Sequence, residues 1–206
     1  MPQRTVTLIR HGQCRPEGED PPLTQLGQQQ AAITADLFKE HDIKTIHYST
    51  LQRSRETAEI IAHQLPSASL IGYECLWEGI PTIPPQFSKF FEDQARENPD
   101  FRSSNVRNVQ LRLDEAFLEI FTPPADRDVH DLVICHGNVL RYLICRALNI
   151  DLHAWVQLHP LANCSLSQTI IAPNLIHEAR NAGVTLTTLF TFNETWHLPQ
   201  GLRTFS

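Results

Sequence analysis

The segment Val6-Thr7-Leu8-Ile9-Arg10-His11-Gly12 decides the fold, because it is a short apolar run that stops abruptly at Arg-His-Gly. Such a run predicts a buried β-strand that delivers a guanidinium and an imidazole to its carboxyl end. In open α/β sheets, ligands bind beyond the carboxyl ends of the strands. A second run of this kind, Leu132-Val133-Ile134-Cys135-His136-Gly137, lies far downstream. Two strands that each end in His-Gly predict one shared site.

Strands and helices are expected to alternate around these two runs. Residues 79–105 lack a clean period and are expected to form an excursion over the carboxyl edge of the sheet, with a short helix near 87–96. Thr24 is expected to cap the first helix, and Ser49 or Thr50 the second. The remaining pattern predicts helices at 25–40, 51–65, 106–121 and 138–148, strands at 45–49, 69–72 and 131–135, and a final hairpin of 166–172 and 184–192 with a turn rich in Asn, Gly and Pro.

This alternation predicts a three-layer α/β sandwich, in which helices cover both faces of a mostly parallel central sheet. The final hairpin is expected to add antiparallel pairing at one edge. A chain of 206 residues suits a single catalytic domain, residues 1–206, because one hydrophobic core can serve that length.

The composition excludes several function classes. A net charge of −6 argues against a nucleic-acid-binding surface. The five cysteines are scattered without a CxxC pair, which is typical of reduced thiols in a cytosolic protein. The start of the chain lacks the apolar core of a secretory signal, and no apolar run approaches the roughly 20 residues that span a bilayer. We therefore expect a cytoplasmic protein without a membrane anchor of its own.

Four short segments together suggest phosphoryl transfer. His11 is a candidate nucleophile for phosphorus, and Arg10, Arg53 and a protonated His136 are candidates to neutralise charge on the phosphate oxygens. Glu78, the only carboxylate of the segment 76–81, could protonate the leaving oxygen and then activate water. Two glycines, Gly12 and Gly137, are expected to leave room for the backbone to approach the ligand.

Four motifs occur in the order found in a known family: Arg-His-Gly, L-T-x-x-G-x-x-Q-A at 23–31, S-x-L-x-R-x-x-x-T-A at 49–58, and the second His before a helix. On these motifs the chain resembles the histidine phosphatase superfamily (phosphoglycerate mutase-like, branch 1), most closely its mitochondrial serine/threonine protein phosphatases. The resemblance implies that His11 accepts the phosphoryl group, that Glu78 donates a proton, and that Arg10, Arg53 and His136 form the phosphate pocket. Many members carry an Asn where this chain has Glu17, which would repel phosphate unless it turns away.

Other residues of the same types are expected to play structural roles. Arg55 is interpreted as a solvated charge, and Arg141 as a pocket-rim residue or a surface salt-bridge partner. Asn138 is interpreted as a helix cap. The aromatic side chains Trp77, Phe87, Phe90 and Phe91 are expected in the core, with a place in the pocket wall as the alternative. The histidines show no metal-ligand spacing, so neither a metal nor a cofactor is expected. The histidines assigned to structure are His41, His47, His63, His130, His153, His159, His177 and His197.

Three functions remain open at this point. The first is a phosphomonoester hydrolase that works through a phosphohistidine on phosphoserine, phosphothreonine or phosphohistidine proteins. The second is a sugar-phosphate mutase or phosphatase of small metabolites, and the third is a non-catalytic module that binds phosphoproteins. The expected partner is a phosphorylated protein or a small phosphomonoester. A homodimer through an edge strand or a helix face also stays open.

Overall fold

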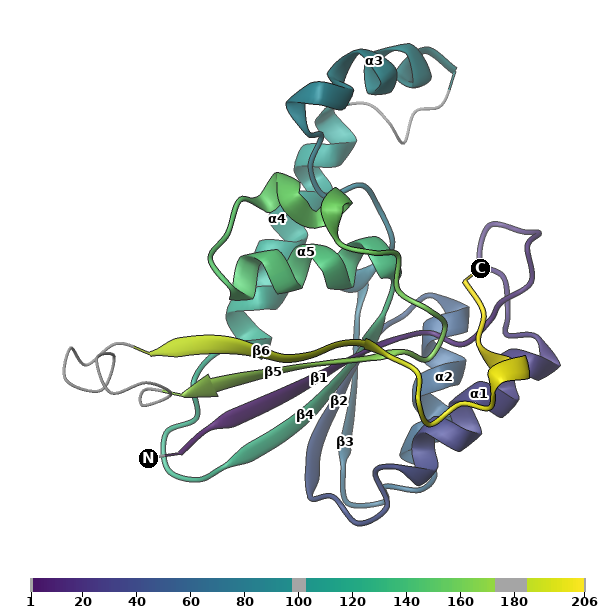
Figure 1. The fold of residues 1–206 in the computed structure, drawn as a ribbon, viewed down its shortest axis with the longest axis vertical. Helices are drawn as coiled ribbons and strands as arrows, with labels where there is room; N and C mark the ends of the chain where they lie inside the picture. Colours follow the sequence, from purple (N-terminus) through teal and green to yellow (C-terminus); the bar gives the residue numbers. More distant parts are fainter. Residues whose placement is uncertain (1, 98–102, 173–184, 206) are drawn as a thin grey trace.

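The computed structural model describes residues 2–97, 103–172 and 185–205 (Figure 1). Its centre is a six-stranded sheet in the order β3-β2-β4-β1-β5-β6. The four strands from β3 to β1 are parallel, β5 is antiparallel to β1, and β6 is antiparallel to β5. The strands are β1 (Arg4–Arg10), β2 (Ile43–Ser49), β3 (Ser69–Tyr73), β4 (Val129–Cys135), β5 (Leu166–Ala172) and β6 (Leu186–Glu194). The predicted strands and the antiparallel hairpin edge are confirmed, and the expected hairpin turn lies within 173–184, outside the described residues.

The register of the two central strands brings the two His-Gly motifs together. Arg10, the last residue of β1, lies opposite Cys135, the last residue of β4. Because both strands run in the same direction, the residues that follow them, His11 and His136, leave the sheet at the same level. The backbone N–H of His11 extends this pairing by one hydrogen bond, to the Cys135 carbonyl at 3.0 Å.

Helices cover both faces of the sheet, which confirms the three-layer sandwich (Figure 1). Side chains alternate along β1, so Leu8 packs with α4 and α5 while Ile9 packs with α1 and α2. The strand that leads to His11 is therefore packed on both of its faces. The helices are α1 (Gln25–Asp36), α2 (Gln52–Ala62), α3 (Ser88–Glu97), α4 (Ser103–Ile120) and α5 (Gly137–Ala147).

The starts of the first two helices differ from each other. Thr24 caps α1 as predicted, since its hydroxyl accepts a hydrogen bond from the Gly27 N–H at 3.0 Å. The prediction of a Ser49 or Thr50 cap for α2 is wrong, because Leu51 holds the N-cap position and offers no side-chain acceptor. Asp20, from the loop before α1, accepts the Gln52 N–H at 2.7 Å instead.

The excursion after β3 carries α3 and the amino-terminal part of α4 away from the body of the molecule (Figure 1). Phe91 is buried there as predicted, but Trp77, Phe87 and Phe90 are 41, 43 and 57% exposed. The expectation that these three rings pack in the core is wrong. Phe87 and Phe90 lie on the excursion that leaves the body of the molecule, whereas Trp77 lies before it, next to Glu78. Among the residues described, no helix is both long and apolar enough to cross a bilayer.

Candidate active site

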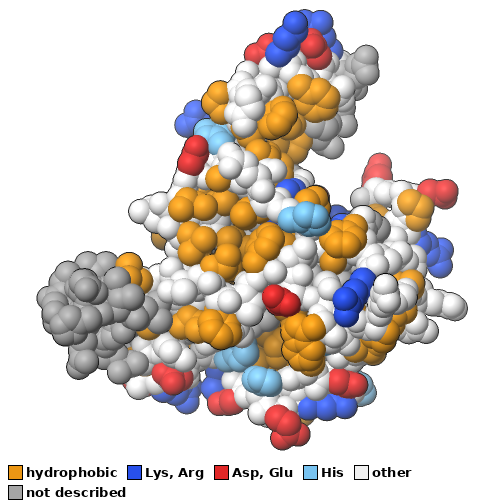
Figure 2. Space-filling view, in the orientation of Figure 1, with side chains coloured by type: hydrophobic (Ala, Val, Ile, Leu, Met, Phe, Trp, Pro, Cys, Tyr) orange, Lys and Arg blue, Asp and Glu red, His pale blue; other side chains and the backbone are white. Residues whose placement is uncertain are grey.

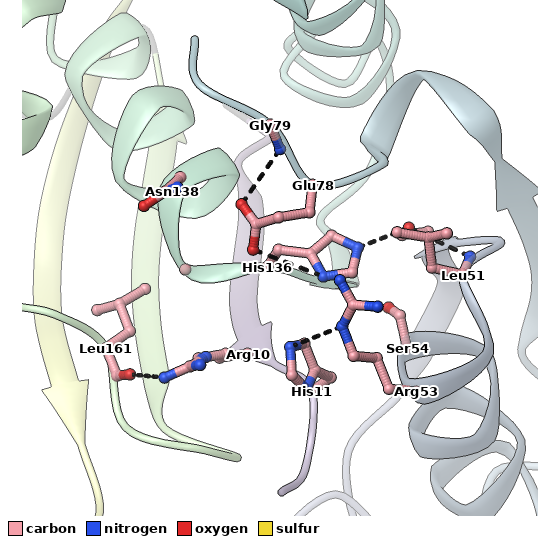
Figure 3. Close-up of polar contacts among 12 residues, drawn as sticks. Arg10, His11, Leu51, Arg53, Ser54, Glu78, Gly79, His136, Asn138 and Leu161 are labelled. Atoms are coloured by element: carbon pink, nitrogen blue, oxygen red, sulfur yellow. Dashed lines mark hydrogen bonds and ion pairs between the residues drawn. The ribbon is translucent and has the colours of Figure 1, made fainter. Parts of the chain in front are cut away.

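His11 lies directly after β1 and is buried, with 3% of its surface exposed. Its Nδ1 lies 2.7 Å from the carbonyl oxygen of Gly12, so Nδ1 must carry the proton and donate it. The other ring nitrogen, Nε2, then has a free electron pair and accepts a hydrogen bond from Nε of Arg53 at 3.2 Å (Figure 3). Burial, reinforced by Arg10 and Arg53, lowers the pKa of His11 to about 3. The ring is therefore neutral near pH 7 and its Nε2 is available as a nucleophile.

His136, the N-cap residue of α5, is fully buried beside His11, with 5.3 Å between the ring centroids. Its Nε2 lies 2.8 Å from the hydroxyl of Ser49, whose oxygen also accepts the Leu51 N–H at 3.4 Å. The Ser49 hydroxyl is thus free to donate its proton to Nε2, which leaves the imidazole proton on Nδ1. This Nδ1 is buried and has no hydrogen-bond partner, so its N–H can donate to a bound ligand.

The expectation of a protonated His136 is not supported by these surroundings. Burial lowers the pKa of His136 well below its usual value, and the neighbouring charges of Arg53 and Arg10 act in the same direction. These surroundings therefore hold His136 as a neutral donor. A phosphate dianion would reverse the balance of charge and favour its protonated form.

Two arginines flank the histidine pair from different elements. Arg10, at the end of β1, donates from Nη1 to the Leu161 carbonyl at 2.6 Å, whereas its buried Nε has no hydrogen-bond partner. Arg53, in the first turn of α2, contacts His11 through Nε and lies 3.8 Å from Asp20 through Nη1. These guanidinium groups and the amino-terminal end of α2 place positive charge around the histidines.

Glu78 completes the group, with one carboxylate oxygen 3.8 Å from Nδ1 of His136 and the other accepting the Gly79 N–H at 3.3 Å (Figure 3). Desolvation raises the pKa of Glu78, although the Gly79 N–H and the arginines oppose the shift. Arg112 of α4 holds this segment by donating to the carbonyls of Cys75 at 2.8 Å and Glu78 at 3.2 Å. A carboxyl with a raised pKa beside a neutral nucleophile has the character of a proton donor.

A close contact between two glycines positions the loop that carries His11. A Cβ at Gly12 would lie 2.6 Å from the carbonyl oxygen of Gly27 in α1. Gln30, one turn further along α1, accepts the Gln13 N–H at 2.8 Å and donates to the Leu202 carbonyl at 2.6 Å. The L-T-x-x-G-x-x-Q-A motif therefore holds the Arg-His-Gly loop against α1.

The two glycines of the His-Gly motifs thus differ in what they do. The expectation that Gly12 leaves room for a ligand is replaced by this packing role. At Gly137 a Cβ would meet only the Arg10 side chain, at 3.7 Å or more, which is an ordinary contact. Gly137 lies at the start of α5, where its N–H is close to the site.

The residues interpreted as structural lie mostly away from the histidine pair. Arg55 is exposed and pairs with Glu59 at 4.0 Å, as expected of a solvated charge. Asn138 does not cap α5; its side-chain oxygen accepts from Arg141 at 2.6 Å. Arg141 also donates to the Leu158 carbonyl and lies over the Trp155 ring, so the surface salt-bridge reading of this residue is not supported.

The remaining histidines contact other parts of the chain. Examples are the hydrogen bonds of His47 to Tyr73 and His130 to Thr7, and the ring contact between His159 and Phe205. His177 lies outside the described residues. No group of three or more His, Cys, Asp or Glu side chains within the described part of the chain is arranged to hold a metal ion.

Several residues of this site have no signal of their own in the sequence. Ser49 fixes the His136 ring, Thr57 accepts the Gly12 N–H at 3.1 Å, and Asn163 donates to the His11 carbonyl at 3.1 Å. Ser49 and Thr57 could have been found only through the S-x-L-x-R-x-x-x-T-A motif, because both occupy fixed polar positions in it. Asp20 and Asn163 reach the site only through the tertiary fold.

Comparisons with known proteins agree with this arrangement. A sequence profile described as the histidine phosphatase superfamily (branch 1) matches residues 6–178. The protein named "Serine/threonine-protein phosphatase PGAM5, mitochondrial" from Xenopus tropicalis is 34% identical over 184 residues, covering 83% of this chain and 61% of the relative. The human protein of that name is 33% identical over 184 residues, covering 83% of this chain and 59% of the relative. The chain thus spans about three fifths of the length of these relatives.

Solved structures share the fold. A phosphoglycerate mutase from Plasmodium falciparum superposes with a TM-score of 0.61 at 28% identity, covering 97% of this chain and 96% of that chain. YhfR of Bacillus stearothermophilus gives a TM-score of 0.68 at 23% identity, covering 94% of this chain and 98% of its own.

The names of the relatives overturn one expectation. The PGAM5 proteins are named mitochondrial, so the prediction of a cytoplasmic protein is wrong by this comparison. That prediction rested on scattered free thiols and on the lack of a secretory signal, and neither observation distinguishes the cytosol from the mitochondrion.

Proposed function

This chain belongs to the histidine phosphatase superfamily (branch 1), and from that membership we propose that it is a phosphomonoester hydrolase with a phosphohistidine intermediate at His11. The observation that carries the proposal is the unprotonated Nε2 of His11, held beside a buried Nδ1 of His136 that makes no hydrogen bond. One nitrogen can attack phosphorus while the other donates to a phosphate oxygen. Residues 1–206 would act as one catalytic domain, which the single continuous sheet supports.

In the first half of the reaction, the electron pair of His11 Nε2 attacks phosphorus and the bond to the ester oxygen breaks. Glu78, whose pKa is raised, gives its proton to that leaving oxygen. Arg10 through its unpartnered Nε, Arg53 and His136 stabilise the negative charge on the transferred group. The Gly137 N–H at the amino-terminal end of α5 adds a further positive dipole.

In the second half, water attacks phospho-His11. Glu78 accepts a proton from this water, inorganic phosphate leaves, and Nε2 recovers its electron pair. The neutral state of His11, which its buried position enforces, is the state needed for a new turnover.

We propose phosphoserine and phosphothreonine proteins as substrates, since two relatives are named serine/threonine-protein phosphatases. The similarity to a phosphoglycerate mutase, at 28% identity, favours a sugar-phosphate mutase as the second candidate. Incubation with 3-phosphoglycerate tests the second candidate, because a mutase forms the 2-isomer whereas a protein phosphatase does not. The oligomeric state, including a homodimer, stays a prediction that light scattering on the purified protein checks.

Rapid quenching with a radiolabelled phosphomonoester tests the mechanism. The expected product is a protein phosphate that is labile in acid and stable in base, absent from His11→Asn and present in His63→Asn, a matched control at an exposed histidine of the α2 carboxyl end. Undiminished turnover by His11→Asn would refute the proposed nucleophile.

A further inference from the structure

An acidic loop, defined as residues 14–22, stands beside the candidate site. It carries three carboxylates, Glu17, Glu19 and Asp20, against a single cation, Arg15, and these four residues are exposed. The two ends of the loop are joined by an isolated antiparallel β-bridge between the backbones of Cys14 and Leu23. The Arg15 N–H also donates a hydrogen bond to the Pro22 carbonyl at 3.0 Å. In Figure 1 it is the purple loop near the carboxyl terminus, and Figure 2 shows acidic side chains at its tip.

One member of this loop reaches the edge of the phosphate pocket. The Asp20 carboxylate lies 3.8 Å from Nη1 of Arg53, whose Nε contacts His11. One carboxylate of the loop, Asp20, is therefore separated from His11 only by the Arg53 side chain. It is held there because Asp20 also accepts the Gln52 N–H.

The pocket itself gives an independent sign of the ligand it takes. His136 is fully buried with an unpartnered Nδ1, and Nε of Arg10 is buried without a hydrogen-bond partner. Both are donors, so the ligand places an anionic group there. A ligand held there lies near Asp20, the carboxylate of the acidic loop that borders the pocket.

We propose that the acidic loop selects phosphorylated protein segments in which Lys or Arg neighbours the phosphorylated residue. A small metabolite with a second phosphate or a carboxylate would bring like charge to Glu17, Glu19 and Asp20 and be disfavoured. Trp77, 41% exposed and adjacent in sequence to Glu78, adds apolar surface that suits a polypeptide. This inference rests on the proposed function, because it names the substrate class of the same pocket.

Matched phosphoserine peptides test the selection. Three peptides of equal length would carry two Lys, two Gln or two Glu beside the phosphoserine, and 3-phosphoglycerate would serve as the acidic metabolite. We expect kcat/KM to fall from the Lys to the Gln to the Glu peptide, by about threefold or more at each step at low salt. Ionic strength of about 0.5 M should largely abolish the differences, because exposed charges are screened.

The variant E17Q/E19Q should bring the three peptides to within about twofold of one another. The matched control E40Q/D42N removes two exposed carboxylates just before β2, at the amino ends of the parallel strands and away from the site. This variant should keep the preference. p-Nitrophenyl phosphate, which has no flanking charge, should be hydrolysed equally by the wild type and E40Q/D42N, and E17Q/E19Q should retain turnover of it. Equal kcat/KM for the peptides, or a preference that survives E17Q/E19Q, would overturn the selection while leaving the phosphatase intact. Absence of p-nitrophenyl phosphate turnover in the wild type would instead refute the proposed function.

Discussion

Replacing Gly12 by Ala tests whether the contact with α1 positions the nucleophile. The new Cβ would lie 2.6 Å from the Gly27 carbonyl oxygen and 3.1 Å from its carbonyl carbon, and both atoms belong to the backbone. The helix cannot easily shift, because a Cβ-sized space at Gly27 is itself filled by the Gln13 carbonyl at 2.1 Å. The Arg-His-Gly loop must therefore move instead.

The expected cost follows from these distances. Overpacking of this kind costs about 1–3 kcal/mol of unfolding free energy. A displacement of the loop by roughly 1 Å would lower kcat/KM about 100-fold, because the attack on phosphorus depends on alignment. Gly137→Ala is the matched control, since its Cβ makes only contacts of 3.7 Å or more and α5 gains a better helix former.

Urea unfolding followed by circular dichroism would measure stability, and p-nitrophenyl phosphate hydrolysis would measure kcat/KM at a pH where both variants are folded. We expect Gly12→Ala to lose both, and Gly137→Ala to change stability by less than about 1 kcal/mol. Near-identical behaviour of the two variants would show that the glycine contact does not position the loop.

Three further predictions follow from the site. Asp20→Asn should lower the KM for p-nitrophenyl phosphate about two- to fivefold in steady-state assays, because Arg53 loses a competing carboxylate; a raised KM would contradict this. Ser49→Ala should lower kcat about tenfold and cost about 1 kcal/mol of stability, since Nε2 of His136 loses its partner, while an unchanged kcat would exclude this positioning role. His11 has a folded pKa of about 3 against an unfolded value of 6.5, so the unfolded chain binds its proton first and stability falls as pH drops from 6.5 to 3. His11→Asn should reduce the slope of unfolding free energy against pH by about 1.4 kcal/mol per pH unit below pH 6.5, with no such effect above pH 7. Urea titrations at pH 4, 5, 6 and 7.5 would measure this slope, and an unchanged slope would contradict the prediction.

The layered fold could be predicted because local patterns agree with it. Apolar runs such as 6–9 and 132–135 are too short for buried helices and end in polar residues, and each became a buried strand. The candidate pair His11 and His136 could be placed together because parallel strands end at one edge of a sheet. The register between β1 and β4 could not be predicted from the sequence, and it is this register that places the centroids of the two rings 5.3 Å apart.

Features that depend on distant residues could not be predicted. The cap of α2 comes from Asp20, more than thirty residues before Gln52, so a search of the neighbouring sequence selects the wrong residue. The neutral state of His136 results from complete burial, which a strand-end position does not reveal. The exposure of Phe87 and Phe90 was missed because an aromatic residue usually signals a core, whereas here the segment leaves the body of the molecule.

The position of β1 in the sheet has a consequence for protein synthesis. Of the six strands of the sheet, β1 leaves the ribosome first, yet its hydrogen-bonded neighbours are β4 and β5, which end at Cys135 and Ala172. In the nascent chain, β1 therefore lacks its native neighbours until β4 has been translated. A translation product that stops before β4 would carry His11 without His136 and would be catalytically silent.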